Sequence, residues 1–589
     1  MSTYNLPQWQ KSDLPPITTN LSDFMSFRNR QFLLVDKTAL ICNLINDRKV
    51  SLFRPRRFGK TLLLSTIREL YTNGTKNFEG LAIHDLWQYP CCPVISLSFF
   101  GMSNPETFEH ELCAHMRDAF AQAGFVDALS IKTDSIIDLT AELDLLRGQQ
   151  AIVILVDECD FPLSANLNNP EAFARNQNIL RLFYAWERDL DNLEFIMFTG
   201  IGRYQESTLF SGQDIVDVSF EPMYANLLGY TQEELESYFA PHISAAASLL
   251  KISEEQLLDD LKRQYYGFCF DSDAEIAVYN PIDINNFFLQ VIEYPESAPV
   301  FGSYWMNSAN SEPLLLKFLE RNKTGLAFLD DVKDQGVWIF QYDLNNVFTF
   351  DNKLHFPVLM TQTGYFTIKQ AINNSPSSFS RIYACSFPNQ EIELAYGKIF
   401  VRYLTQSHRR HSEHDKWLRQ ETENLRQALG EQDMAQVVNV LNVFLCAIPY
   451  DLRANAKEVA FRTFIGWCLQ SSAERKVRSE ALNNSSSSDL EFTLNDCSYV
   501  VELKLLTQQQ QQDPQNAANL AASAQQQIYD RGYDFNDQDG DNIKHYGLAL
   551  VVSEHSRQIE YWRYFDGSNV IAESAVAPVS MENSPEQSQ

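Results

Sequence analysis

A short run of residues between an apolar strand and a helix has the composition of a phosphate-binding loop. The run reads LFRPRRFGKT over residues 52–61 and ends in Gly59, Lys60 and Thr61. Glycine lets backbone N–H groups approach phosphate oxygens, lysine reaches the β and γ oxygens, and threonine can ligate Mg²⁺. We therefore predict that this loop, including Arg57 and Phe58, binds the phosphates of ATP together with Mg²⁺.

One position of the loop departs from the usual pattern, because Arg54 stands where the first glycine is expected. Two later segments support the site. The first is the apolar strand 151–156, which ends in Asp157 and Glu158. In a nucleotide-hydrolysing site, the first carboxylate would hold Mg²⁺ through water, and the second would polarise the attacking water.

The second supporting segment is the apolar strand 195–199. It ends at Thr199, which we expect to sense the γ-phosphate, and Arg203 follows in a loop as a candidate phosphate contact. Each signal is common by itself, but strand–GKT–helix, strand–Asp-Glu and strand–Thr-Gly in this order are much less common. The order predicts a nucleotide site. Hydrolysis stays open, since binding without turnover uses the same loop.

A second group of polar residues, near the C-terminus, has the composition of a nuclease centre. Glu502 and Lys504 alternate along one strand, so they share a face of it, and Asp489 starts the neighbouring strand. We predict that Asp489 and Glu502 ligate Mg²⁺, with the Leu503 carbonyl as a third ligand. Lys504 would orient or deprotonate the water and stabilise the charge on the phosphate.

Three further residues could complete this centre. Glu458 on the preceding helix and Glu480 are candidate acidic groups, and Gln527 on the following helix could contact the water or the substrate phosphate. The alternative is structural, because Glu-x-Lys on a strand is often a solvated edge or an ion pair. The surroundings are also not basic, since residues 450–535 carry 8 Lys/Arg and 11 Asp/Glu.

The elements that must position the first site alternate between strands and helices. Short apolar runs predict buried strands, and the runs between them have the helical period. Strands are expected at 50–53, 94–99, 151–156 and 195–199, and helices at 60–71 and 105–123. Continuous apolar strands separated by helices indicate a parallel sheet that is covered on both faces.

A second α/β unit is expected to position the other site. It comprises a helix at 458–469, a hairpin of strands 490–494 and 499–503, a helix at 517–529 and a closing strand at 545–552. The chain before it is mixed, with strands at 339–342 and 365–368 and a helical segment at 408–445. We predict five parts: an N-terminal arm (1–24), a phosphate-loop domain (25–235), a mixed helical region (236–445), a nuclease-like domain (446–569) and a disordered tail (570–589).

Composition limits the classes of partner. The chain has 589 residues with 47 Lys/Arg and 76 Asp/Glu, a net charge of −29, so a nucleic-acid partner would need a local basic surface. Residues 1–70 carry 11 Lys/Arg and 5 Asp/Glu. None of the 10 cysteines forms a CxxC pair, which argues against zinc ribbons. No apolar run reaches the ~18 residues of a membrane span, so we expect a cytoplasmic protein without a membrane partner.

Further stretches resemble the bacterial AAA-ATPase-like family. Besides the loop, they are VDKTALICNLI (35–45), FEGLAI (78–83), VDECDFPL (156–163), TGIGRYQESTLFSG (199–212), YYGFCF (265–270), VYNPIDINNFF (278–288), QTGYFTI (362–368) and AIPYDL (447–452). In that family, arginine at the first loop position is usual, and a C-terminal PD-(D/E)XK-type nuclease-like domain is common. Gln527 matches its Q-I-x-x-(K/R)-x-Y element.

The resemblance covers about residues 25–535 and implies a fold class. We expect an α/β protein with a parallel-sheet P-loop NTPase domain of the RecA/AAA-like type, a mixed helical middle and a C-terminal restriction-endonuclease-like α/β domain. The favoured function is cleavage of a DNA or RNA phosphodiester that is gated by ATP. Two alternatives stay open: a nucleotide-dependent switch or scaffold that binds a protein partner without cutting, and remodelling driven by ATP hydrolysis without cleavage.

Overall fold

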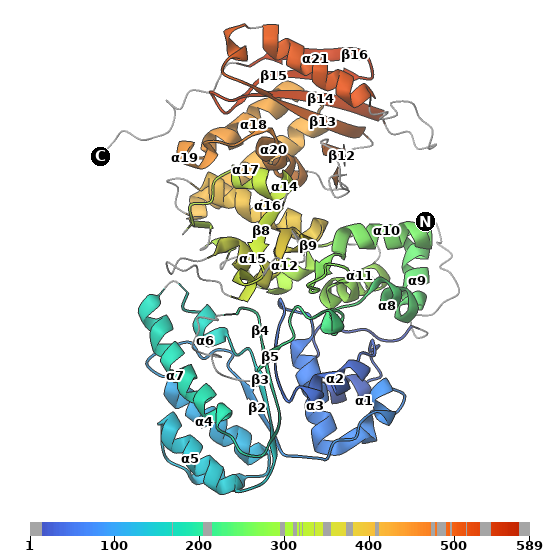
Figure 1. Ribbon diagram of the computed structural model, residues 1–589. Coiled ribbons are helices and arrows are strands. Elements are labelled where there is room, and N and C mark those ends of the chain that lie inside the picture. The colour runs from blue at the N-terminus through green and yellow to red at the C-terminus, as the bar shows by residue number, and fades with distance from the viewer. Residues whose placement is uncertain are drawn as a thin grey trace. The chain divides into compact units, whose positions relative to one another are not determined.

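The computed structural model describes most of the chain between residues 14 and 576 (Figure 1). The described ranges are interrupted at 168, 204–214, 295–300, 310–314, 317–318, 321, 335, 346–354, 373–380, 407–410, 473–476, 480–489, 495–496, 514 and 531–543. Among the described helices, none is both long enough and apolar enough to cross a membrane.

The chain divides into two compact units. Unit 1 comprises Met1–Ala309 and Val337–Glu393, and unit 2 comprises Asn310–Gly336 and Leu394–Gln589. The region that the sequence predicts as a separate middle part, 236–445, is divided between the two units. The fold therefore groups segments that are distant along the chain.

Unit 1 is built around a five-stranded parallel sheet with the order β2-β3-β4-β1-β5. The strands are β1 (Lys49–Phe53), β2 (Val94–Ser98), β3 (Ile152–Asp157), β4 (Leu193–Gly200) and β5 (Val216–Asp217). The four predicted strands and their parallel arrangement are confirmed. The short edge strand β5 adds to them, and it lacks an apolar run that could have predicted it.

Helices cover both faces of this sheet, which explains why every residue of β3 is buried. Figure 1 shows α1, α2 and α3 on one side of the sheet and α4, α5 and α7 on the other. Their bounds, with the short α6, are α1 (Phe24–Asn29), α2 (Ala39–Asn46), α3 (Lys60–Asn73), α4 (Phe108–Gln122), α5 (Ile136–Arg147), α6 (Phe161–Ser164) and α7 (Pro170–Arg188). The residues that follow β1, β3 and β4 meet at the carboxyl edge of the sheet, where α/β folds bind ligands.

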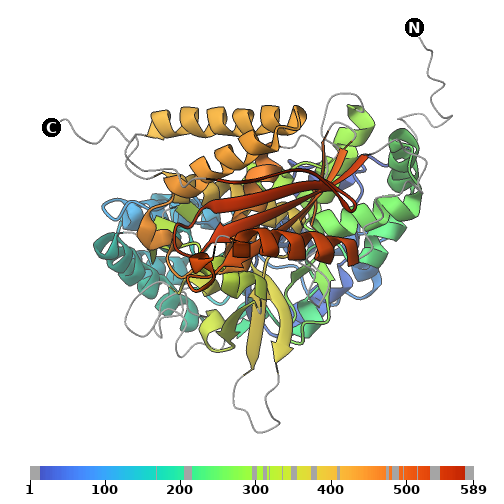
Figure 2. The same ribbon diagram turned by 90° about the horizontal axis from the view of Figure 1, so that it is seen from above.

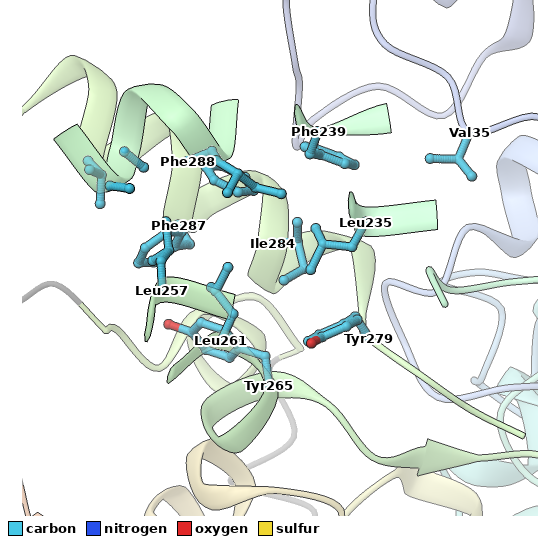
Figure 3. Packing of buried hydrophobic residues seen from close by; sticks show 14 residues of the cluster. Val35, Leu235, Phe239, Leu257, Leu261, Tyr265, Tyr279, Ile284, Phe287 and Phe288 are labelled. Carbon is cyan, nitrogen blue, oxygen red and sulfur yellow. The ribbon is translucent and has the colours of Figure 1, made fainter. Parts of the chain in front are cut away.

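A helical group follows the sheet in unit 1. It comprises α8 (Gln232–Tyr238), α9 (Ala240–Leu250), α10 (Glu254–Tyr265) and α11 (Pro281–Glu293), so the predicted boundary at residue 235 falls inside a helix. Figure 3 shows its core, in which Val35 from the segment before β1 joins Leu235, Phe239 and Ile284. The start of the phosphate-loop domain is thereby anchored to this helical group.

Two small sheets complete unit 1. The first is a ladder of β6 (Phe268–Cys269) and β7 (Ala277–Val278). The second has the order β8-β10-β9, and Figure 2 shows β9 and β10 side by side. The remaining bounds are α12 (Tyr304–Ala309), β8 (Val337–Phe340), α15 (Phe356–Thr363), β9 (Thr367–Ile372) and β10 (Ile382–Ser386).

Unit 2 contains a six-stranded sheet with the order β11-β12-β13-β14-β15-β16. The strands are β11 (Val477–Ser479), β12 (Leu490–Leu494), β13 (Cys497–Leu506), β14 (Lys544–Ser553), β15 (Ile559–Asp566) and β16 (Asn569–Ala575). Only β13 and β14 pair in parallel among these strands. A parallel pair needs a crossover, and α21 (Gln515–Asp530) lies between the two strands in the sequence.

Helices lie on both faces of the unit 2 sheet. Ala521, Ala524 and Ile528 of α21 pack with Val500 and Leu506 on one face. Figure 1 shows α18 and α20 on the other side of the sheet. The helices of unit 2 besides α21 are α14 (Phe328–Asp334), α16 (Gln390–Thr405, which begins at the end of unit 1), α17 (His411–Gly430), α18 (Met434–Ala447), α19 (Tyr450–Arg453) and α20 (Glu458–Ser472).

Two expectations for the C-terminal part are corrected. The strand predicted at 545–552 does not close the sheet, because β15 and β16 extend it. The disordered tail predicted from residue 570 is wrong for residues 570–575, which belong to β16. The sequence of these residues resembles a tail because most of β16 is exposed at the edge of the sheet, where it pairs with β15 alone among the described strands.

Candidate functional site

The predicted phosphate loop connects β1 to α3, and α3 begins at Lys60. Gly59 has φ +97°, a left-handed conformation that glycine adopts without strain. The side chain of Lys60 folds back over the loop, where Nζ donates to the carbonyls of Arg54 (2.8 Å) and Pro55 (2.9 Å). The backbone thus wraps around the lysine at the N-terminus of a helix, which is an arrangement suited to an anion.

Burial makes the charge of Lys60 costly. It lowers the pKa of Lys60 to about 8, although Asp157, Asp160 and Glu158 favour the charged form. A bound phosphate would supply further negative charge beside the ammonium group and restore its pKa.

The carboxylate of Asp157, at the end of β3, is hydrogen-bonded to β4 and to the first turn of α3. Its Oδ2 accepts from Thr61 Oγ1 (2.6 Å), and its Oδ1 accepts from Thr199 Oγ1 (2.7 Å) and from the backbone N–H of Glu158 (3.0 Å). Thr61 is exposed and Thr199 is fully buried. The tertiary structure therefore brings these predicted residues together, with Thr199 holding Asp157 in place. A contact from Thr199 to a γ-phosphate remains a prediction.

Glu158 follows Asp157 in a strained position. Its φ is +51°, which is rare for a residue with a side chain and recurs at functional sites. Burial raises the pKa of Glu158, and the charge of Asp157 raises it further, while Arg56 and Lys60 lower it. A carboxylate with a raised pKa is a better proton acceptor near neutral pH.

Asp160 is a residue that the sequence reasoning missed. It is buried and accepts from the backbone N–H groups of Ile201 (3.1 Å) and Gly202 (3.0 Å), which come directly after β4. At Gly200 a Cβ would lie 2.5 Å from Asp160 Oδ1. Asp160 thereby fixes the backbone beside Thr199, and a second aspartate three residues after Asp157 was the available signal.

The predicted loop residues Arg57 and Phe58 have different settings. Arg57 is exposed with φ +71°, so its side chain is accessible at the loop. Phe58 is 1% exposed, and its ring packs edge-on against Phe268 and Phe270. The side chain of Phe58 therefore anchors the loop, and only its backbone is available for a phosphate.

Arg203, the predicted second phosphate contact, is buried in an ion pair. Its guanidinium lies 2.9 Å from Asp217, and its backbone N–H donates to Gln362 Oε1 (2.8 Å). The ring of Phe220 lies 4.9 Å from its guanidinium carbon. A phosphate contact from Arg203 remains a prediction.

Arg54, at the position of the usual first glycine, is built into the core. Its guanidinium donates to the carbonyls of Phe53 (3.0 Å), Tyr224 (3.2 Å) and Ser219, and it lies 4.2 Å from the ring centroid of Phe270. Burial and the nearby Arg203 lower the pKa of Arg54 to about 9. The buried side chain of Arg54 thus fixes the start of the loop to the core of unit 1.

Arg54→Gly, which restores the usual loop pattern, is expected to reduce stability. The carbonyls of Ser219 and Tyr224 would lose their buried donor and a cavity would remain, at a cost of about 2–4 kcal/mol in the free energy of unfolding. Urea denaturation measures this difference. Arg57→Gly is the matched control, and we expect a change below about 1 kcal/mol, because this arginine is exposed and has a positive φ. Equal losses in both variants would contradict the role of Arg54.

The second candidate site lies in unit 2, around Lys504 on β13. Lys504 Nζ donates to Glu502 Oε1 (2.9 Å) and to Gln527 Oε1 on α21 (2.5 Å). Glu458 at the start of α20 accepts from the backbone N–H of Leu505 through Oε2 (3.2 Å). Four of the predicted residues therefore converge from one strand and two helices. Asp489 and Glu480 lie outside the described residues.

The convergence distinguishes two interpretations of Glu-x-Lys. An ion pair between Glu502 and Lys504 is also what a purely structural interpretation predicts. The arrival of Gln527 and Glu458 from separate helices at the same stretch of β13 is not required by that interpretation. Glu502 is almost completely buried, while Lys504 remains partly exposed. No set of three or more metal-ligating His, Cys, Asp or Glu occurs within the described ranges, which leave out Asp489.

Comparison with known proteins finds a family match over the first site. Residues 18–210 match the model of the AAA-ATPase-like family, described as a predicted AAA-ATPase. The AAA-ATPase-like segment thus contains β1 to β4 together with Lys60, Thr61 and Asp157. The match supports a nucleotide-binding ATPase site, and it ends before unit 2.

A relative of similar length is also known. The chain is 25% identical over 525 residues to an uncharacterized protein in the vnfD 5' region of Azotobacter chroococcum mcd 1, which covers 85% of this chain and 89% of that protein. The similarity therefore extends over both units, and not only over the AAA-ATPase-like segment.

Proposed function

We propose that unit 1 binds and hydrolyses ATP. The observation that carries this proposal is the link from Thr61 through Asp157 to Thr199, at the carboxyl edge of the parallel sheet and beside the loop that holds Lys60. Lys60 would contact the β- and γ-phosphates, and the backbone of residues 57–59 would cradle them. The AAA-ATPase-like match of residues 18–210 supports the same assignment.

The residues at the loop fit Mg²⁺ because their donors are hard oxygens. Thr61 Oγ1 and Asp157 Oδ2 are 2.6 Å apart, and both are of the type that Mg²⁺ prefers. Thr61 and Asp157 would hold the ion, which when bound supplies neutralisation of the phosphate charge. Glu158 would accept a proton from the attacking water at its carboxylate.

Glu158→Gln tests hydrolysis separately from binding. We expect ATP binding to persist while phosphate release falls by about 10²–10⁴-fold, because the amide cannot accept the proton. Wild-type hydrolysis should also decline as the pH falls through the raised pKa of Glu158. Calorimetric titration measures binding, and a phosphate-release assay measures turnover. The control is the exposed Glu171→Gln on α7, and unchanged hydrolysis in Glu158→Gln would contradict the proposed base.

A second function is proposed for unit 2, which is Mg²⁺-dependent cleavage of a nucleic-acid phosphodiester gated by ATP. It is supported by the convergence of Glu458, Glu502, Lys504 and Gln527. The two glutamates and Asp489 are proposed as ligands of Mg²⁺, and their carboxylate oxygens suit this ion. Lys504 would orient the water and stabilise the charge of the phosphate. Gln527 would position the ammonium group of Lys504, which donates to its side-chain oxygen.

The competing function for unit 2 is that of a switch or scaffold. In that case, nucleotide binding in unit 1 would change the affinity of unit 2 for a protein partner, and nothing would be cut. The acidic chain, with a net charge of −29, favours a protein partner over bulk nucleic acid. Cleavage assays with variants of Lys504 separate the two.

A further inference from the structure

A pair of buried carboxyl groups lies behind the phosphate loop in unit 1. Asp283 belongs to the first turn of α11 and Glu391 to the first turn of α16, and both are 0% exposed. Glu391 Oε1 accepts from the backbone N–H of Trp305 at the start of α12 (2.9 Å). The core in Figure 3 holds α11 through Ile284, the neighbour of Asp283.

The pair requires a proton. Among the described residues, no donor meets full hydrogen-bond geometry at either Asp283 oxygen or at Glu391 Oε2, although the backbone N–H groups of Trp305 and Met306 face the pair and favour its charged form. Two ionised carboxylates have only acceptors, so they can bond to each other only if one of them is protonated. Burial raises the pKa of Asp283 to about 8, and burial together with the charge of Asp283 raises the pKa of Glu391. The remaining titratable groups that face the pair are the phenols of Tyr265 on α10 and Tyr304 on α12, which stay neutral in this range.

Both members of the pair are linked to the same carbonyl of the phosphate loop. Trp305, bonded to Glu391 through its backbone, donates from its indole Nε1 to the carbonyl of Arg56 (3.3 Å). Asn280, the N-cap of the helix that carries Asp283, donates from Nδ2 to the same carbonyl (3.5 Å). In the sequence, Arg56 directly follows Arg54 and Pro55, whose carbonyls accept from Lys60 Nζ. Its carbonyl therefore belongs to the part of the loop that surrounds Lys60.

A tight packing contact accompanies this link. At Gly364, with φ +91°, a Cβ would lie 2.8 Å from Pro55 of the loop and 3.4 Å from the Trp305 ring. Trp305 also packs edge-on against Tyr365, with ring centroids 5.4 Å apart. A shift of Trp305 therefore cannot be absorbed locally without moving the loop, because packed interiors transmit displacement.

We propose that the carboxyl pair of Asp283 and Glu391 positions the phosphate loop through Trp305 and Asn280, and that loss of its shared proton weakens nucleotide binding. The proposal rests on the proposed function of unit 1 as an ATP site. Two carboxylates in a fully buried site repel each other when both are ionised, so they must separate or admit water. Movement of Glu391 carries the Trp305 backbone with it and withdraws the indole from the Arg56 carbonyl. Trp305 and Asn280 are thus positioning residues.

The direction of the pH effect follows from the raised pKa values. Below the pKa of the pair one proton is shared and the loop is held, and as the pH rises through about 8 the second charge appears. The stability contributed by the pair is lost progressively as the pH rises from the ordinary carboxyl pKa of about 4 to about 8, because over that range the folded chain holds a proton that the unfolded chain has released. Lys60 also loses its charge near pH 8, so wild-type affinity alone cannot identify the pair.

The test compares ATP affinity at about pH 6.5 and about pH 9, on either side of the titration. From pH 6.5 to pH 9, wild-type affinity should fall by about threefold to tenfold more than that of Asp283→Asn, the range that one hydrogen bond gives. Glu391→Gln should show the same reduced pH dependence of ATP affinity as Asp283→Asn. It replaces Asp283→Asn in the test if that variant does not fold. Glu187→Gln is the matched control: Glu187 is a buried carboxyl with a raised pKa in the same unit, bonded to Lys49, and the variant should keep the wild-type pH dependence.

Hydrogen exchange of the loop makes the test independent of nucleotide. In nucleotide-free wild type, the amides of residues 54 and 56–60 should lose protection at pH 9 after correction for the intrinsic rate, and in Asp283→Asn they should not. Trp305→Phe should show low protection and weak ATP binding at both pH values. If the variants and the wild type lose affinity and protection equally, the proposal is overturned. If no protein binds ATP, the proposed function fails, and loop exchange alone then decides for or against the positioning role.

Discussion

Lys60→Ala is expected to abolish ATP hydrolysis and to weaken ATP binding by about 10²-fold or more, the scale of losing one preorganised charge contact to a phosphate. The physical reason is the position of Nζ, which the loop carbonyls of Arg54 and Pro55 already hold at the centre of the turn. No other described lysine or arginine shares these two carbonyls. Calorimetric titration with ATP and Mg²⁺ measures the loss of affinity, and phosphate release measures the loss of turnover.

The control for Lys60→Ala is Lys76→Ala. Lys76 is exposed in the same unit, so this variant changes the net charge equally without touching the loop. Both variants should unfold at similar urea concentrations, because removal of Lys60 also removes the cost of burying its charge. Wild-type affinity for ATP in Lys60→Ala, in a folded protein, would show that the loop is not the phosphate site.

Lys504→Ala is expected to remove Mg²⁺-dependent cleavage of DNA or RNA, by about 10²–10³-fold, while ATP hydrolysis in unit 1 continues. Lys504 bonds to Glu502 and Gln527 and remains partly exposed, so its ammonium group can reach a substrate phosphate. The assay uses mixed single- and double-stranded DNA and RNA with Mg²⁺ or Mn²⁺, with and without ATP. Gel separation of labelled strands measures the cleavage rate.

Lys544→Ala is the matched control for Lys504→Ala. Lys544 is exposed and pairs with Cys497 at the opposite end of the β13–β14 ladder. Cleavage should persist in this variant. If neither the wild type nor the control cuts any substrate while ATP is still hydrolysed, unit 2 is a binding module, and the switch or scaffold function takes the place of cleavage.

The two variants together decide the proposed gating. If ATP gates the second site, Lys60→Ala should lose cleavage as well as hydrolysis, although unit 2 is unchanged. Equal cleavage rates with and without ATP would separate the two activities. The two sites would then belong to independent reactions on one chain.

Local patterns predicted the elements that carry both sites. The strand before the loop, the helix from Lys60, and the strand 490–494 are signalled by apolar runs and by residues near in the sequence, and the structure contains them. The parallel sheet followed from continuous apolar strands, because such strands need cover on both faces. The weaker signals belonged to exposed elements, and β16 was taken for a tail because its residues mostly face solvent.

The contacts that specialise the loop were decided only by the tertiary structure. The guanidinium of Arg54 is held by the carbonyls of Ser219 and Tyr224, which lie far away along the chain. Arg203 is held by Asp217 and by the distant Gln362. No periodicity or spacing in the sequence relates such residues, because hydrogen bonding and burial depend on the distance between atoms in the folded protein.

By itself, the sequence determined that this protein has a GKT loop with the composition of a phosphate loop, a strand ending in two carboxylates and a Glu-x-Lys strand, because the residues of each motif lie within a few positions of one another. Only the tertiary structure decided that Thr61, Asp157 and Thr199 share one hydrogen-bonded link, and that the buried carboxyl groups of Asp283 and Glu391 face each other, linked to the Arg56 carbonyl through Asn280 and Trp305. The reason is that folding brings together groups 40 to more than 100 residues apart, and their chemistry depends on the distance and the burial that result.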